Sequence, residues 1–184
     1  MASRLAGACG ADSMALMLNK LFAAFRADHP EDDLPASDTG MAIGALLVRV
    51  ARADGEGSAA EMALVERILA QRFRLGPAEA ARLRETCEKL HAVAPETDTF
   101  ARLIRETTEL DTRLATLDAL WEVLLAGDTI REEELRMVEK ARKAMGLSRL
   151  DSARARERAE NQAGSVTDAT EAGAETGAGR TGHQ

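Results

Sequence analysis

Aromatic side chains are scarce in this sequence of 184 residues, which contains no Tyr, one Trp and four Phe. Strands favour aromatic and β-branched residues, and no run alternates such residues with polar ones, so a β-sheet is not expected. Ala, Leu, Arg and Glu dominate instead, and all four form helices readily. The composition therefore predicts an all-α protein.

Cysteine and long apolar runs are also scarce. Cys9 and Cys87 lie far apart, which is not the pattern of a disulfide framework and favours a reducing compartment. The N-terminus lacks the run of about 7 to 15 apolar residues that a secretory signal needs. No stretch of about 18 apolar residues is free of charge. We therefore expect a cytoplasmic protein without a transmembrane helix.

Signals of catalysis and of nucleic-acid binding are missing too. The sequence has no nucleophile elbow and no glycine-rich phosphate loop. The formal net charge is −7, and Arg residues are interspersed with Glu rather than gathered into a basic stripe. These absences argue against an enzyme and against a nucleic-acid partner.

One pair of residues has a spacing used by metalloenzymes. Glu88 and His91 form a Glu-x-x-His motif, which di-iron helical bundles need in two copies. The other histidines are His29 and His183, in polar segments near the two ends, so the sequence offers no second copy. We therefore expect His91 to be an exposed residue near a helix end, where an imidazolium ion interacts favourably with the helix dipole.

Apolar residues at helical spacing define seven segments in the middle of the chain. They cover about 39–53, 59–73, 77–93, a short segment from 99, 111–126, 130–145 and a segment that follows Ser148. Pro77 is a natural first residue for the third of these helices. The pattern predicts one compact helical bundle over residues 38–160.

The two ends of the chain differ from this middle part. Within residues 1–37, the segment 13–26 places its Met, Leu and Phe side chains on one helical face and is followed by an acidic linker with two prolines. Two alternatives stay open for this amphipathic helix, which either docks on the bundle or makes a peripheral contact with a membrane surface. Residues 161–184 are rich in Gly, Thr, Ala and Glu and are predicted to form a disordered tail.

The stretch "ARADGEGSAAE", residues 51–61, stands between two predicted helices and carries three carboxylates, Asp54, Glu56 and Glu61. It has an echo 73 residues later, where "LLVRVARADGEGSAAEMALV" is matched by "ALWEVLLAGDTIREEELRMV". Both copies run from an apolar helix through a Gly and an acid into a new helix, and Glu61 aligns with Glu134. The echo predicts a duplicated helix-turn-helix pair whose copies bury each other's apolar faces.

Taken together, these segments resemble the tellurite-resistance TerB-like domain family, which has an "ADGE" type turn near its start and another near its end. The resemblance covers residues 38–158 and includes "LLVRVARADGE", "RFRLGPAEA", "FARLI", "LDALWEVLLAGD" and "GLSRLDSARARERAE". It implies a compact all-helical bundle, related also to the N-terminal domain of a membrane-anchored DnaJ-type co-chaperone. It further implies that acidic residues of the two turns bind a divalent metal.

By motif position, the resemblance assigns the metal site to Asp54, Glu56 and Glu61 in the first turn, and only Glu134 matches the family pattern in the second. Asp54 and Glu56 are the main candidate ligands, and Glu61, Asp128 and Glu134 are the lesser ones. The second turn departs from the family pattern, because it reads "AGD" where the family has "ADG". One turn supplies at most three carboxylates, whereas Ca²⁺ takes about six to eight oxygen ligands, so the second turn has to come alongside the first. Ca²⁺ and Mg²⁺ are the ions that such oxygen ligands suit best.

The same acids also have an explanation that needs no metal. Ser58 and Glu61 form the capping box pattern Ser-x-x-Glu at a helix start, and acids in a first turn interact favourably with the helix dipole. In the second copy, the capping-box pattern selects Thr129 and Glu132. The alignment of the two copies instead matches Glu134 with Glu61, so the two alignments differ by two residues. We favour the latter register, because it aligns apolar residues with apolar ones.

Two functional hypotheses follow. In the first, the protein is a non-enzymatic TerB-like helical module that binds a divalent metal through its acidic turns and is associated with the response to tellurite or to general stress. In the second, it is a metal-free scaffold for protein–protein interaction whose acidic turns are helix caps. The partner protein is not identified by the sequence under either hypothesis.

Overall fold

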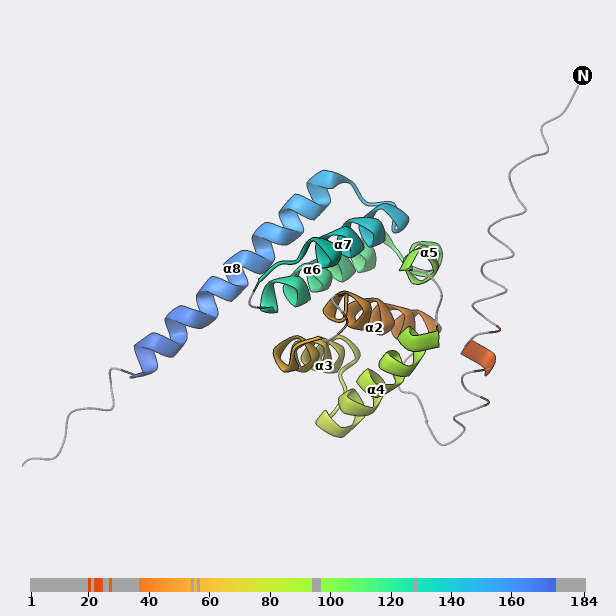
Figure 1. Ribbon diagram of the computed structural model, residues 1–184, viewed down its shortest axis with the longest axis horizontal. Coiled ribbons are helices and arrows are strands. Elements are labelled where there is room, and N and C mark those ends of the chain that lie inside the picture. The colour runs from red at the N-terminus through yellow and green to blue at the C-terminus, as the bar shows by residue number, and fades with distance from the viewer. Residues whose placement is uncertain are drawn as a thin grey trace, which may run out of the picture.

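The computed structural model describes residues 20, 22–24, 27, 37–53, 55, 57–93, 97–127 and 129–174, with side chains up to residue 164. Every regular element in these residues is a helix (Figure 1). The helices are α2 (Asp38–Ala51), α3 (Ala59–Phe73), α4 (Pro77–Val93), α5 (Thr97–Thr107), α6 (Leu110–Ala126), α7 (Glu132–Ala144) and α8 (Arg149–Ala174). The prediction of an all-α bundle with a repeated helix pair is confirmed.

The helix boundaries agree closely with the apolar spacing of the sequence. Helices α3 and α4 begin and end at the predicted residues, and the predicted ends of α2, α5, α6 and α7 differ from the observed ones by at most two residues. Local chemistry accounts for this agreement. For example, Ser37 caps α2 by accepting a hydrogen bond from the backbone N–H of Gly40, and Pro77 opens α4.

Helix α2 lies at the centre of the bundle, surrounded by other helices (Figure 1). All of its residues from Gly40 to Ala51 are buried, and α3, α4, α5, α6 and α7 all pack against it. The sequence pattern predicted a single buried stripe, but the helix is covered on every side. A helix buried in this way has to be apolar all round, as this one nearly is.

Helices α2 and α4 pack closely where Gly44 of α2 meets Cys87 of α4. A Cβ atom at Gly44 would lie 2.3 Å from the Cys87 Sγ, so the missing side chain is what lets α4 approach α2. Cys87 is fully buried, and burial raises the pKa of its thiol to about 12. The thiol is therefore a protonated packing group rather than a nucleophile.

Helix α8 packs along α6 and joins it to α7 through hydrogen bonds. Trp121 Nε1 donates to Ser152 Oγ at 3.1 Å, and the Ser152 hydroxyl donates to Glu139 Oε1 at 2.8 Å. Nearer the exposed end of the contact, Arg158 Nη2 donates to Asp118 Oδ1 at 2.5 Å. Trp121 is thus a core residue, as its helical spacing predicts.

The ends of the chain are described only in part. Of the predicted N-terminal helix, residues 20 and 22–24 are described and are helical, and Phe22 is 1% exposed and belongs to the core cluster. The buried Phe22 favours docking on the bundle. Helix α8 continues to Ala174 and so enters the segment predicted to be disordered, although residues 160–164 are exposed. Its Ala-rich sequence extends a helix already nucleated on the bundle.

None of the helices in the described part of the chain is both long and apolar enough to cross a membrane.

We predict that Gly44→Ala destabilises the fold. Alanine is the better helix former by up to about 1 kcal/mol, but its Cβ would overlap the Cys87 sulfur, and overpacking of this kind costs about 1–3 kcal/mol. Urea unfolding measures the change in the free energy of unfolding. Because Cys87→Ala removes the sulfur, Gly44→Ala should cost clearly less in that background.

Gly164→Ala is the matched control, because Gly164 is also helical and a Cβ there would meet no atom within 4 Å. This substitution should not destabilise the protein. Equal effects of the two Gly→Ala substitutions, or the same cost of Gly44→Ala with and without the sulfur, would contradict the close-packing explanation.

Candidate functional site

The first acidic turn leaves α2 through a glycine-dependent reversal. The backbone N–H of Gly55 donates to the Arg52 carbonyl at 2.9 Å. Gly55 has a φ of +95° and Gly57 a φ of +62°, in a region where residues with a side chain are strained. A Cβ at Gly57 would also lie 2.9 Å from the Ala51 carbonyl oxygen. Both glycines are therefore required by the backbone path.

The turn ends in a complete capping box at the start of α3. The Ser58 hydroxyl accepts from the backbone N–H of Glu61 at 3.1 Å, and Glu61 Oε2 accepts from the backbone N–H of Ser58 at 2.8 Å. Glu61 is only 6% exposed. The capping role predicted for this glutamate is thus confirmed, and it engages one of the two carboxylate oxygens.

The second turn leads into α7, where one of the two hydrogen bonds of a capping box is present. Glu134 is 4% exposed, and its Oε2 accepts from the backbone N–H of Arg131 at 3.0 Å. An arginine side chain has no hydrogen-bond acceptor, so Arg131 cannot provide the half of the capping box that Ser58 provides in the first copy. The register that aligns Glu134 with Glu61 is confirmed, and the alternative pair of Thr129 and Glu132 is wrong.

The two turns lie next to each other. A Cβ atom at Gly127, the first residue after α6, would lie 2.5 Å from Glu61 Oε1. Oε1, the carboxylate oxygen of Glu61 that the capping box does not use, therefore faces the second turn. Among the described residues, nothing donates a hydrogen bond to Oε1, because the one hydrogen bond of this carboxylate is made through Oε2.

Asp54, Glu56 and Asp128 lie outside the described residues. Within the described ranges, no three His, Cys, Asp or Glu side chains come close enough together to hold a metal ion. The structure thus brings Glu61 to the second turn and buries both Glu61 and Glu134, each with one oxygen used in a cap. Carboxylate oxygens can accept further ligands, so this donor chemistry fits a hard cation.

The Glu88 and His91 pair is engaged by arginines rather than arranged for a metal. Glu88 accepts from Arg52 at 2.6 Å and also pairs with Arg84 one helical turn away. Arg49 donates through Nε to the Nδ1 atom of His91 at 3.1 Å, and through Nη2 to the His91 carbonyl. Nδ1 is thus an acceptor and the imidazole is neutral.

This arrangement corrects the expectation for His91. The residue is half-buried, and burial lowers the pKa of the imidazole, with the positive charges of Arg49 and Arg52 adding to the effect. An imidazolium is therefore disfavoured here, and the nearby arginines outweigh any gain from the helix dipole.

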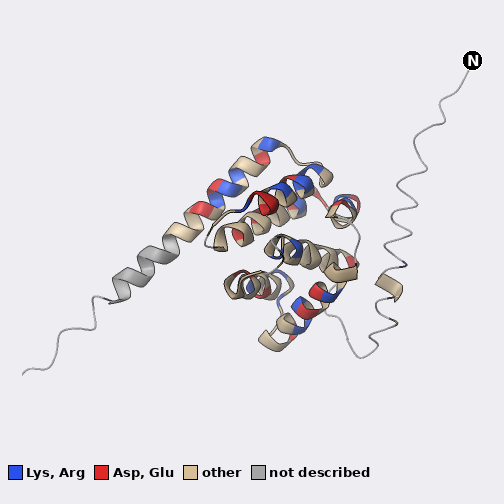
Figure 2. Ribbon diagram, viewed as in Figure 1, with Lys and Arg blue, Asp and Glu red and all other residues tan. Residues whose placement is uncertain are grey.

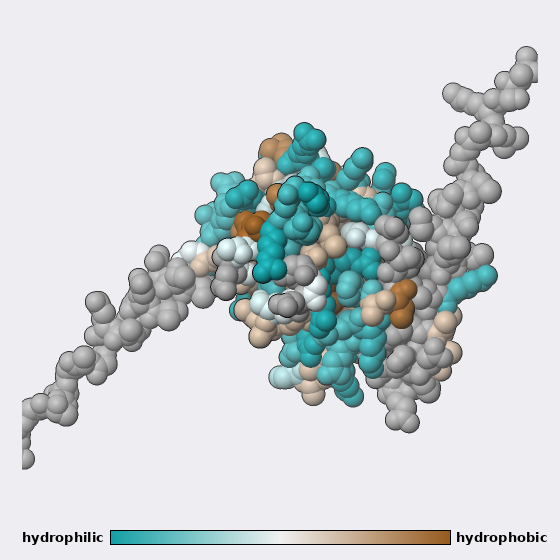
Figure 3. Space-filling view, viewed as in Figure 1, coloured by the Kyte–Doolittle hydropathy of each residue, from teal (hydrophilic) through white to brown (hydrophobic). Residues whose placement is uncertain are grey.

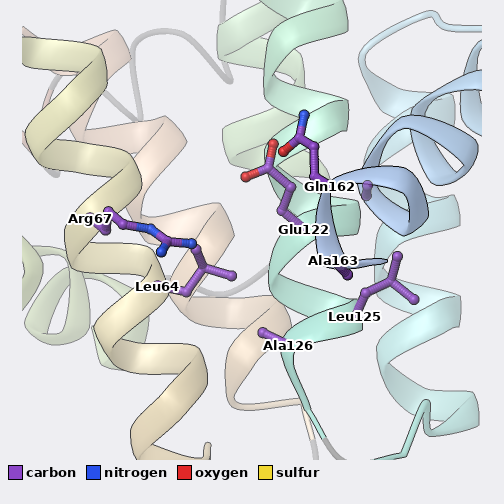
Figure 4. A pocket seen from close by; sticks show the side chains of 8 residues that line it. Leu64, Arg67, Glu122, Leu125, Ala126, Gln162 and Ala163 are labelled. Atoms are coloured by element: carbon purple, nitrogen blue, oxygen red, sulfur yellow. The ribbon is translucent and has the colours of Figure 1, made fainter. Parts of the chain in front are cut away.

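A cavity between α3, α6 and α8 was not predicted (Figure 4). It encloses about 260 Å³ and is lined mainly by Leu and Ala side chains, with Arg67 on α3 and Glu122 on α6 facing it. Burial raises the pKa of Glu122, and the neighbouring Asp118 raises it further. Three helices far apart in the sequence form this cavity, so no local motif could reveal it.

We predict that His91 makes the protein less stable in mild acid. A lowered pKa means that the unfolded chain takes up the proton first, so the free energy of unfolding falls as the pH drops below about 6.5. His91→Gln keeps an acceptor for Arg49 but does not titrate. Urea unfolding at pH 7, 6 and 5 should show a larger loss for the natural chain than for the variant. Parallel losses would contradict this assignment, since both proteins share all other titrating groups.

Comparison with known proteins agrees with the geometry of the two turns. The sequence model of the family described as tellurite resistance protein TerB matches residues 40–157, which include all of α3 to α7, both turns and most of α2. Searches of curated proteins and of solved structures return no significant match. Because the match covers more than half of the chain, the protein belongs to the TerB family.

Proposed function

We propose that this protein is a cytoplasmic, non-enzymatic helical module that binds a divalent metal ion, Ca²⁺ or Mg²⁺, between its two acidic turns. The observation that carries the proposal is the position of Glu61 Oε1. This oxygen belongs to a buried carboxylate, faces the second turn at Gly127, and receives no hydrogen bond from the described residues. This second oxygen of the carboxylate is therefore available as a ligand to a cation held between the two turns.

Ligands from both turns would complete such a site. Asp54 and Glu56 precede the capping box and are not needed by it, so their carboxylates are the first candidates. Glu61 contributes Oε1, and Asp128 and Glu134 are the candidates from the second turn. Backbone carbonyls of the glycine-containing first turn and water supply the remaining oxygens that a hard cation requires.

Shared ligands would tie the α2–α3 pair to the α6–α7 pair. The turns already lie side by side, so ligation calls for adjustment rather than rearrangement. In the family context, this change in the relative position of two helix pairs alters the surface offered to a protein partner. The association with tellurite or general stress rests on the family assignment.

A metal-free interaction scaffold is the second candidate, and the caps themselves favour it. Ser58 and Glu61 make both hydrogen bonds of the capping box without any metal, and Glu134 caps Arg131. In that case the acids stabilise helix starts, and a protein partner or a membrane surface is recruited elsewhere, for which the N-terminal helix 13–26 is the candidate.

Two conservative substitutions separate the cap from the metal ligand. Glu61→Gln keeps the capping box, because Gln serves equally at this position, but it removes the charge from Oε1. Ser58→Ala removes the cap hydroxyl and costs about 1 kcal/mol, but leaves every carboxylate in place. Asp54→Asn tests the principal ligand of the first turn.

We predict that millimolar Ca²⁺ or Mg²⁺ raises the thermal midpoint of the natural chain and of Ser58→Ala. At a concentration a hundred times the dissociation constant, binding adds about 2.7 kcal/mol to the free energy of unfolding. The rise should be lost in Asp54→Asn and reduced in Glu61→Gln, as measured by scanning calorimetry. If neither metal moves the midpoint of the natural chain, the scaffold hypothesis replaces the metal hypothesis.

We also predict that deleting the gene in its native host lowers the highest tellurite concentration at which the host still grows. The natural gene should restore growth, and Asp54→Asn should restore it less well at equal protein abundance. Unchanged tolerance in the deletion strain would remove the stress association while leaving the metal titration unaffected.

A further inference from the structure

A groove of about 710 Å³ runs between α5 and α7, away from the two turns. Two contacts join its walls, because Asp98 near the start of α5 pairs with Lys140, and Arg105 near the end of α5 lies against Gly146 after α7. Figure 2 shows the Lys and Arg residues of α7 toward the end of the helix that lies near α5. The lining consists of Asp98, Arg102, Arg105, Glu106, Lys140, Lys143 and Ala144.

This groove is positively charged in an acidic protein. Its lining holds four cationic and two anionic side chains, whereas the whole chain has a formal net charge of −7. Clefts lined by one sign of charge concentrate oppositely charged ligands. The surface seen in Figure 3 is largely hydrophilic, so the sign of the charge, not an apolar patch, distinguishes this site.

Some cations of the groove are paired less closely than several arginines elsewhere in the described residues. Arg52, Arg142 and Arg158 each have a carboxylate oxygen within 2.9 Å. In the groove, the carboxylate of Asp98 lies 3.9 Å from Arg102.

Two groove cations have no ion-pair partner at all in the described part of the chain. These are Arg105 and Lys143, and neither side chain donates a hydrogen bond to any described residue. Each lies in the last turn of its helix, where the dipole attracts cations. The dipole explains why a positive charge is tolerated there. However, the interaction with the dipole leaves the five N–H donors of the Arg105 guanidinium and the three of the Lys143 ammonium group available for hydrogen bonds.

Arg105 is held in place by the turn after α7. Gly146 has a φ of +74°, and a Cβ atom there would lie 3.1 Å from Arg105 Nε and 3.2 Å from Cζ. The guanidinium therefore packs against backbone that lacks a side chain. Such packing restricts the arginine before any ligand arrives, which reduces the entropy lost on binding.

We propose that this groove binds a small anion that carries two or more phosphate groups. Arginine presents a planar fork to phosphate oxygens and lysine a point charge, and here both converge from two helices. The volume is within the range of small-molecule sites, about 300–1,000 Å³, and exceeds the needs of a single phosphate. This activity is additional to the proposed metal site and uses none of its residues.

The test is calorimetric titration of the full chain with tripolyphosphate, in low salt and with EDTA present so that metals play no part. We expect one site per chain and an affinity that falls as salt is added. Arg105→Gln with Lys143→Gln should weaken binding by at least about tenfold, since two charged hydrogen-bonding groups are lost. Glu106→Gln removes a groove carboxylate and should tighten binding about twofold or more.

Arg136→Gln is the matched control. Arg136 is an exposed cation on α7 that pairs with Glu132 and does not line the groove, so this variant should bind as the natural chain does. The proposal is overturned if tripolyphosphate fails to bind at millimolar concentration, if Arg136→Gln weakens binding as much as the groove variant, or if inorganic phosphate binds equally well. Asp54→Asn should retain full affinity, which separates this result from failure of the metal hypothesis.

Discussion

The burial of α2 on all sides is the constraint on which the rest of the structure depends. Because no face of this helix can meet water, five other helices have to cover it, and glycine at position 44 is needed where α4 comes closest. The one cation inside this shell, Arg49, is 6% exposed and is satisfied by His91 and by the ring of Phe100, 5.4 Å from its Cζ. The role of His91 follows from the same requirement, since it accepts hydrogen bonds from the buried Arg49, while Glu88 next to it pairs with the partly exposed Arg52 and Arg84.

The position of the two acidic turns is a consequence of this packing. Helix α2 contacts α6, so the turn that follows α2 and the turn that follows α6 emerge side by side. The departure of the second turn from the family pattern then has a physical reason. Glu61 Oε1 occupies the space that any side chain at position 127 would need, and an aspartate there would bring two carboxylates together. The site is therefore asymmetric although the helix pairs are repeated.

Local features of the fold were predictable from the sequence, and long-range ones were not. Apolar spacing and caps define α3 and α4 to the residue, and the echo that aligns Glu61 with Glu134 predicts the buried glutamate of each turn. The complete burial of α2, the arginines around His91 and the groove between α5 and α7 depend on contacts between residues far apart in the chain. No period or short motif encodes such contacts. The sequence therefore predicts an exposed His91 and does not single out Arg105 as a binding residue.

Helix α7 connects the acidic turns with the cationic groove. Its first turn holds Glu134, which caps the helix beside the first acidic turn, and its last turn holds Lys143, which lines the groove. The helix dipole favours this order, with carboxylates at the N-terminus and cations at the C-terminus. The charges that suit a metal cation and those that suit an anion are therefore sorted to opposite ends of one helix of 13 residues. Because α7 packs against both α2 and α5, a change in the position of this helix would alter the surroundings of both of its ends.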